Sequence, residues 1–136
     1  ANGLVWVCLH PFAAADIEGS AEFRIAVDGA DNPAADTLSA AAGRACVSVR
    51  LRRLDDVLAE DGISAVDHLK IDVEGAELRV FDGAPRTLAR ARRIVMEVHP
   101  PHVEPSAVLR RLEALGFSCR IVSESGGSVI VEAVRR

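Results

Sequence analysis

The sequence predicts an α/β fold with a mostly parallel sheet that ends in an antiparallel hairpin. From residue 46 onward, strand-like and helix-like segments alternate, as parallel strands joined by right-handed helical crossovers do. The last two strand-like segments instead flank Gly126 and Gly127, which favours a tight turn between antiparallel strands. The chain has 136 residues, of which 49% are hydrophobic, so we expect a single domain with its own core.

The first 45 residues are the less regular part of the chain. The segment GLVWVCL (3–9) is typical of a short buried strand that ends at His10 and Pro11. AEFRIAV (21–27) alternates between apolar and polar residues, which indicates a second strand. Residues 28–45 are rich in Ala, Asp, Gly and Asn without a period, and this predicts a surface loop.

The rest of the chain has clear periodicity. The predicted elements are a strand at CVSVRL (46–51), a helix at RRLDDVLAEDG (52–62), a strand at VDHLKID (66–72), a helix at GAELRVFDGA (75–84), a strand at RRIVMEV (92–98), a helix at PSAVLRRLEALGF (105–117) and a hairpin of CRIVS (119–123) with SVIVEAV (128–134). Pro105 stands where a helix begins, and Gly116 stands where a left-handed residue ends one.

The composition disfavours several classes of partner. With 16 basic and 20 acidic residues the net charge is −4, so we expect no nucleic-acid partner, which would need a basic face. No apolar run reaches the roughly 18 residues of a membrane span, so we expect no membrane partner. The three cysteines lie far apart without a C-x-x-C spacing, which favours reduced thiols and a cytoplasmic location.

Charged residues gather where two predicted central strands end. Residues two apart in a strand share a face, so Lys70, Asp72 and Glu74 point the same way, as do Glu97 and His99. Ligands of open α/β sheets bind beyond the carboxyl ends of the strands. The sequences DVEG and EVHP therefore line the predicted crevice, and the catalytic candidates there are Lys70, Asp72, Glu74 and His99.

The residue types leave the chemistry open. Asp72, Glu74 and Glu97 can hold Mg²⁺ or another divalent metal, and a carboxylate or the imidazole can instead take a proton from a substrate hydroxyl. Glu97 can equally be a solvated residue at a strand end, and His99 can be a loop residue before Pro100. For Glu77 we expect only a favourable charge at the start of a helix.

Longer stretches carry a family resemblance. The segment VRLRRLDDVLAEDGISAVDHLKIDVEGAELRVFDGAPRTL, followed by RRIVMEVHP and VLRRLEALGF, resembles the C-terminal half of the FkbM-type methyltransferases. The stretch KIDVEGAE is the most specific part, and AAADIEGSAEF resembles the segment after the third strand of that family.

The resemblance implies a class I, Rossmann-like, three-layer sandwich, present in part, that transfers a methyl group from S-adenosylmethionine to a hydroxyl of a small molecule or glycan. It places Ala13, Ala14 and Asp16 near the adenine of the donor, and Asp72 beside both donor and acceptor. Within this interpretation Asp72 or His99 is the base, and Lys70 orients Asp72.

The chain departs from the family in its first part. The glycine-rich loop that would hold the donor, and the acidic residue that would hold its ribose, have no counterpart in this sequence. We therefore expect residues 1–46 to be the third-strand segment and its loop, and residues 47–136 to be the C-terminal α/β core. The missing N-terminal half, or a second chain, becomes an expected partner.

Two other functions stay open. One is a non-catalytic α/β module that binds a partner through the unpaired edge of its fourth strand. The other is a divalent-metal hydrolase that uses the same carboxylates.

Overall fold

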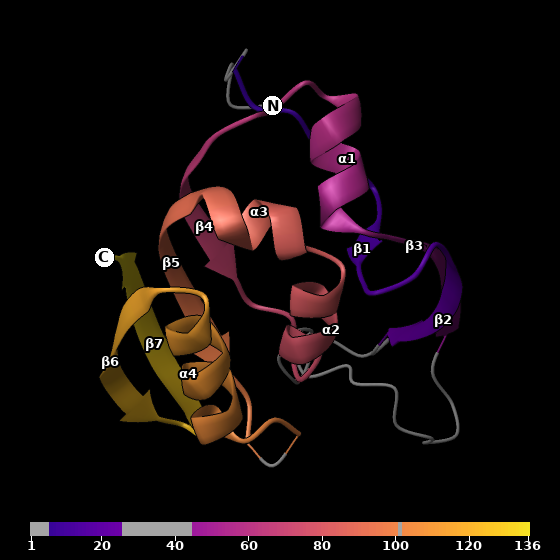
Figure 1. Ribbon diagram of the computed structural model, residues 1–136. Coiled ribbons are helices and arrows are strands. Elements are labelled where there is room, and N and C mark those ends of the chain that lie inside the picture. Colours follow the sequence, from indigo (N-terminus) through magenta and orange to yellow (C-terminus); the bar gives the residue numbers. More distant parts are fainter. Residues whose placement is uncertain (1–5, 26–44, 101) are drawn as a thin grey trace.

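The structure is a computed structural model, and it describes residues 6–25, 45–100 and 102–136. Its elements are β1 (Ala13–Ala14), β2 (Gly19–Ile25), β3 (Ala45–Arg52), α1 (Leu54–Glu60), β4 (Val66–Ile71), α2 (Glu77–Asp82), α3 (Pro85–Arg90), β5 (Ala91–Val98), α4 (Pro105–Ala114), β6 (Phe117–Ser125) and β7 (Ser128–Arg135). They form two sheets, with strand orders β1-β3-β2 and β4-β5-β7-β6 (Figure 1).

Most predicted elements are confirmed from β2 onward, with differences at the beginning and in the middle of the chain. No strand occupies residues 6–10, where Trp6 and Leu9 are exposed; the predicted buried strand was wrong there, and its residues 3–5 lie outside the described ranges. The predicted loop also lies outside them, except for Ala45, which begins β3. Helix α3 was not predicted, although Pro85 stands at its first turn, a position that proline favours.

The prediction of a mostly parallel sheet was wrong. Among the described strands, parallel pairing joins only β1 with β3 and β4 with β5, whereas β2 with β3, β5 with β7 and β6 with β7 are antiparallel. Helices connect β4 to β5 and also β5 to β6, but of these two pairs only β4 and β5 are neighbours in the second sheet. The hairpin then inserts β7 between β5 and β6.

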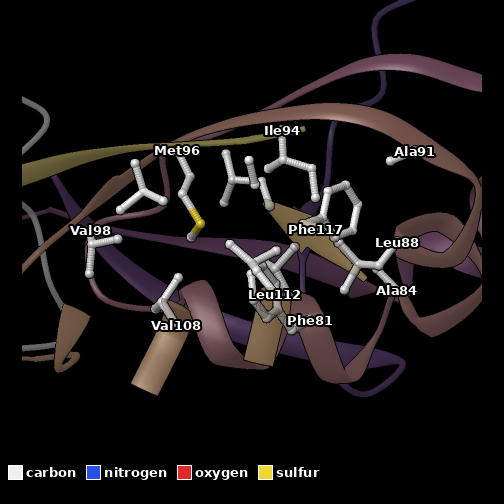
Figure 2. Packing of buried hydrophobic residues seen from close by; sticks show 14 of the residues in the cluster. Phe81, Ala84, Leu88, Ala91, Ile94, Met96, Val98, Val108, Leu112 and Phe117 are labelled. Carbon is white, nitrogen blue, oxygen red and sulfur yellow. The ribbon is translucent and has the colours of Figure 1, made fainter. Parts of the chain in front are cut away.

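The core lies on one face of the second sheet. Ile94, Met96 and Val98 alternate along β5 and are fully buried, and they face apolar side chains of α2, α3 and α4 (Figure 2). Burying a side chain of this size contributes about 2 kcal/mol. On the other face of this sheet His68 and Lys70 of β4 are exposed, and no described helix covers them. The expected three layers are therefore two in the described part of the chain.

A buried aspartate joins the two halves of the fold. Asp55 of α1 is 4% exposed, and its Oδ1 accepts hydrogen bonds of 2.7 Å from both the backbone N–H and the hydroxyl of Thr87. Its Oδ2 accepts a 2.8 Å hydrogen bond from the backbone N–H of Arg86. These N–H groups belong to the first turn of α3, where no helical carbonyl can reach them. Asp55 therefore caps α3 from another helix.

The chain also packs very closely beside this joint. A Cβ atom added to Gly83 would lie 1.9 Å from the backbone oxygen of Ala15, so only glycine fits at the end of α2. Nearby, Arg79 of α2 pairs with Asp16 at 2.8 Å. The segment around β1 is thereby held against α2, which begins a few residues after the end of β4.

Replacing Asp55 by Ala tests the joint. The variant leaves buried N–H donors without a partner, so we expect the free energy of unfolding at pH 7 to fall by about 2–4 kcal/mol in urea denaturation. Asp56→Ala is the matched control, because Asp56 is more exposed and its ion pair with Arg86 contributes about 1 kcal/mol or less. Equal losses in the two variants would contradict the assigned role.

The same residue predicts acid sensitivity. Burial raises the pKa of Asp55, but the hydrogen bonds from Thr87 and Arg86 outweigh it and leave the pKa below its ordinary value of about 4. A depressed folded-state pKa stabilises the fold above the unfolded pKa, and this contribution is lost as the pH falls through the folded pKa. The difference in unfolding free energy between the wild type and Asp55→Ala should therefore be constant near neutrality and shrink below about pH 4.

Candidate functional site

The candidate site lies where β4 and β5 end side by side. The two strands run parallel, with Ile71 of β4 opposite Met96 of β5. The residues that follow these two, Asp72 and Glu97, therefore lie beside each other. His99 follows β5 directly. The register of two neighbouring parallel strands thus delivers two carboxylates and an imidazole to one edge, as the sequence predicted.

His99 is the centre of the polar contacts. Its Nδ1 donates a 2.9 Å hydrogen bond to Oε1 of Glu77. Its Nε2 lies 3.3 Å from Oε2 of Glu74 and 3.7 Å from Oε1 of Glu97. With 14% of its side chain exposed, His99 is a largely buried residue among three carboxylates. His99 does follow β5 in the loop before Pro100, but its burial among carboxylates shows that it is more than a solvated loop residue.

Glu77 is the site residue that the sequence interpretation missed. It begins α2, as predicted, but its side chain is fully buried instead of solvated. Besides the bond from His99, its Oε1 accepts a 3.2 Å hydrogen bond from the N–H of Gly75. The helical spacing could have predicted that Glu77 is buried. Residues 77, 80 and 81 share one face of the helix, and Val80 and Phe81 belong to the core.

The turn between β4 and α2 directs Glu74 toward His99. Glu74 has φ of 47° and Gly75 has φ of 97°, so both residues are in the left-handed region, which is costly for glutamate. A Cβ atom on Gly75 would lie 2.7 Å from Cβ of His102. This turn changes the prediction in one respect: Lys70 and Asp72 share a face, but Glu74 turns to the imidazole.

Lys70 pairs with Asp72, as the resemblance implied. Its Nζ donates a 2.7 Å hydrogen bond to Oδ2 of Asp72, and the lysine side chain is 70% exposed. The predicted metal ligands were Asp72, Glu74 and Glu97. The structure instead brings one donor atom each of Asp72, Glu97 and His99 within 4.8 Å of one another, with His99 in the place of Glu74.

Carboxylates also set the charge of the imidazole. Burial lowers the pKa of His99, but the hydrogen bond to Glu77 and the negative charges of Glu74, Glu77 and Glu97 outweigh it and raise the pKa above its ordinary value. Near neutral pH the ring therefore carries more positive charge than a free histidine would.

Two cavities adjoin these strand ends. The larger measures about 790 Å³ and is lined, among others, by Phe12, Ala13, Ala14, Val73, Glu74 and Arg79. The smaller, about 350 Å³, is lined by Ala14, Lys70 and Asp72 among others. The residues that the resemblance assigned to the adenine therefore lie at the cavities: Ala13 and Ala14 line them, and Asp16 pairs with the lining residue Arg79.

The arrangement can act in two ways. An imidazole whose Nδ1 is held by a buried carboxylate presents Nε2 for proton transfer. The carboxylates around it favour a cationic group next to an apolar cavity. A deep apolar pocket with a few convergent polar groups is the usual form of a small-molecule site.

Comparison with known proteins gives the class of this domain. A family model described as the methyltransferase FkbM domain matches residues 10–119. The chain therefore belongs to the FkbM methyltransferase domain family, and the predicted resemblance is confirmed. Its mixed α/β fold, with the strand ends beside a cavity, is accordingly that of a methyltransferase domain.

Several curated proteins are similar to the chain. The AMB antimetabolite synthetase AmbE of Pseudomonas aeruginosa is 45% identical over 60% of the chain and 4% of its own length. The 31-O-demethyl-FK506 methyltransferase FkbM of Streptomyces tacrolimicus is 43% identical over 48% of the chain and 26% of its own length. The 2-O-methyltransferase NoeI of Sinorhizobium fredii is 43% identical over 38% of the chain and 21% of its own length.

The chain matches only part of each of these relatives. The chain spans about a quarter or less of the length of each of these three relatives. No solved structure matches the chain significantly. Across the described residues, none of the helices has the length and apolar character needed to cross a membrane.

Glu77→Gln tests the electrostatic account of the site. Removing the carboxylate charge weakens the interaction that favours the imidazolium, so the pKa of His99 should fall, which a ¹H–¹⁵N NMR titration of the imidazole measures. Glu97→Gln is the comparison, because its 3.7 Å contact is longer and should give a smaller decrease. An unchanged pKa in Glu77→Gln would disprove the assigned hydrogen bond.

Proposed function

We propose that this domain takes part in transferring a methyl group from S-adenosylmethionine to a hydroxyl of a small molecule or glycan. The observation that carries the proposal is the group of Asp72, Glu97 and His99 in a chain of the FkbM family, with Asp72 lining the smaller cavity and the neighbouring Glu74 lining the larger, apolar one. The names of two relatives, a 31-O-demethyl-FK506 methyltransferase and a 2-O-methyltransferase, support a hydroxyl as the acceptor.

The residues present fit the methyl donor in two respects. The cavity at Ala13 and Ala14 has the apolar lining that an adenine ring needs, and its volume of about 790 Å³ is that of a small-molecule site. The carboxylates of Asp72, Glu74 and Glu97 favour the positive charge of a sulfonium. When bound, the donor would supply an electrophilic methyl group for in-line displacement.

The chain's own groups would manage the proton. The acceptor oxygen loses its proton as it bonds to the methyl carbon, while the carbon–sulfur electron pair stays with sulfur. Nδ1 of His99 already bonds to Glu77, so Nε2 is the atom that would take this proton, either directly or after Asp72. Lys70 would hold Asp72 in its present orientation.

We further propose that these residues are part of a larger class I, Rossmann-like sandwich. The two sheets share no strand pair among the described residues, and β4 is an edge strand. A further segment or a second chain between β3 and β4 would supply the glycine-rich loop that this sequence lacks. The free thiols of Cys8, Cys46 and Cys119 favour a reducing, cytoplasmic setting for the reaction.

The edge of β4 also supports a second candidate function. An unpaired strand edge is a template for pairing with another chain. A domain that binds a partner there, without catalysing a reaction, would need neither the donor nor the acceptor.

Calorimetric titration with S-adenosylhomocysteine distinguishes the two functions. The proposal predicts binding in the micromolar range by this chain. The variant Ala13→Phe should lose that binding, because a bulky side chain would fill the larger cavity. Glu124→Gln, an exposed change on the distant hairpin, is the control and should bind as the wild type does. Absence of binding by a chain with a cooperative unfolding transition would mean either that the donor site needs the further segment or that the domain is a partner-binding module.

A further inference from the structure

We propose that Asp72, Glu97 and His99 are the ligands of a divalent cation such as Mn²⁺, with Glu77 as a positioning residue behind the imidazole. The inference rests on the proposed function and changes one part of it: with the cation bound, Nε2 of His99 would be a ligand instead of the base. The cation would bind the acceptor hydroxyl beside the methyl donor, and the hydroxyl proton would pass to water.

The ligand geometry is nearly formed. One donor atom from each of the three side chains lies within 4.8 Å of the others, which is close to the span of ligands around a single ion with bonds of about 2.1 Å. Asp72 comes from the end of β4 and Glu97 from β5, and the parallel register of these strands fixes their separation. The ligands therefore stand on rigid elements of the fold.

His99 is held as a metal-binding histidine is held. Histidine ligands generally donate their second ring N–H to a carboxylate or carbonyl, which fixes the tautomer and the direction of the free nitrogen. Glu77 accepts this bond from Nδ1 at 2.9 Å while fully buried. The nitrogen left for a cation is Nε2, which lies 3.3 Å from Oε2 of Glu74 and 3.7 Å from Oε1 of Glu97.

The charge around the imidazole also points to a cation. Oε2 of Glu77 is buried and has no hydrogen-bond partner within the described ranges, and such a group is costly without a compensating positive charge. Four carboxylates converge here, and the one lysine beside them occupies only Oδ2 of Asp72 and is itself 70% exposed. The other oxygen of Asp72 remains available, and a bond from lysine to a ligating carboxylate is a common outer-shell contact.

The donor set selects the kind of ion. Carboxylate oxygens suit Mg²⁺, Ca²⁺ and Mn²⁺, whereas imidazole suits transition metals, so two carboxylates with one imidazole favour Mn²⁺ over Mg²⁺. Three protein ligands leave positions open in an octahedral shell. A hydroxyl bound at one of them would be oriented and would lose its proton more readily.

Titration of the chelator-treated chain with MnCl₂, followed by electron paramagnetic resonance of the free ion, tests the site. We expect one Mn²⁺ per chain. Asp72→Asn, Glu97→Gln and His99→Gln should each weaken binding about tenfold or more, and Glu77→Gln should weaken it by a similar factor through the imidazole. Glu124→Gln should bind as the wild type does. Glu74→Gln should retain most of the affinity, because Glu74 is outside the ligand set.

Each contrary result has a definite meaning. Absence of stoichiometric Mn²⁺ binding by the wild-type chain overturns the site, and so does binding that survives in Glu97→Gln, a half-exposed position where the change need not disturb the fold. A loss in Glu74→Gln as large as in Glu97→Gln overturns the ligand assignment. If the chain binds S-adenosylhomocysteine but shows no stoichiometric Mn²⁺ binding, the proposed function stands and only the cation site is refuted.

Discussion

The fold depends on a joint between two sheets that share no hydrogen-bonded strand pair in the described residues. Asp55 makes this joint from α1 by capping α3, and Gly83 lets the segment after β1 approach α2 without a side chain between them. Polar caps and close backbone contacts are directional, unlike apolar packing. The joint therefore fixes where the segment around Ala13 and Ala14 lies relative to the end of β4, and hence the shape of the larger cavity.

The second sheet contributes the other half of the site. Its core is built on alternate residues of β5, and this alternation stops where the strand ends: Glu97 within β5 is partly exposed, whereas His99 follows the strand and is largely buried. His99 packs inward onto Glu77, whereas Glu97 is half exposed beside Asp72. Packing of the hydrophobic core and placement of the polar cluster thus follow from one strand register.

The sequence predicted the elements after residue 45 well because their periodicity and end signals agree, as with Pro105 and Gly116 around α4. It also predicted that charged residues meet at the ends of β4 and β5, and the contact of Lys70 with Asp72. Periodicity alone did not show that β3 and β4 lie in separate sheets, because pairing between strands is a long-range property that local patterns do not encode, whereas the family resemblance implied the unpaired edge of the fourth strand. Glu77 was misjudged because an acidic residue at a helix start is ordinarily solvated, and only its spacing from Phe81 placed it inside.

Glu77 also shows a conflict between stability and site geometry. A buried carboxylate with one unpartnered oxygen is costly, and an apolar residue of similar size would pack into the same core beside Val80 and Phe81. Such a residue would leave Nδ1 of His99 without its acceptor and would free the ring to rotate. The N–H of Gly75 would also lose its hydrogen-bond partner. Gly75 lies in the turn that holds Glu74 in a left-handed conformation. The strained backbone of Glu74 and the buried carboxylate of Glu77 both destabilise the fold, and both residues contact the imidazole of His99. We infer that they are retained because they fix the position of Nε2 at the ends of β4 and β5.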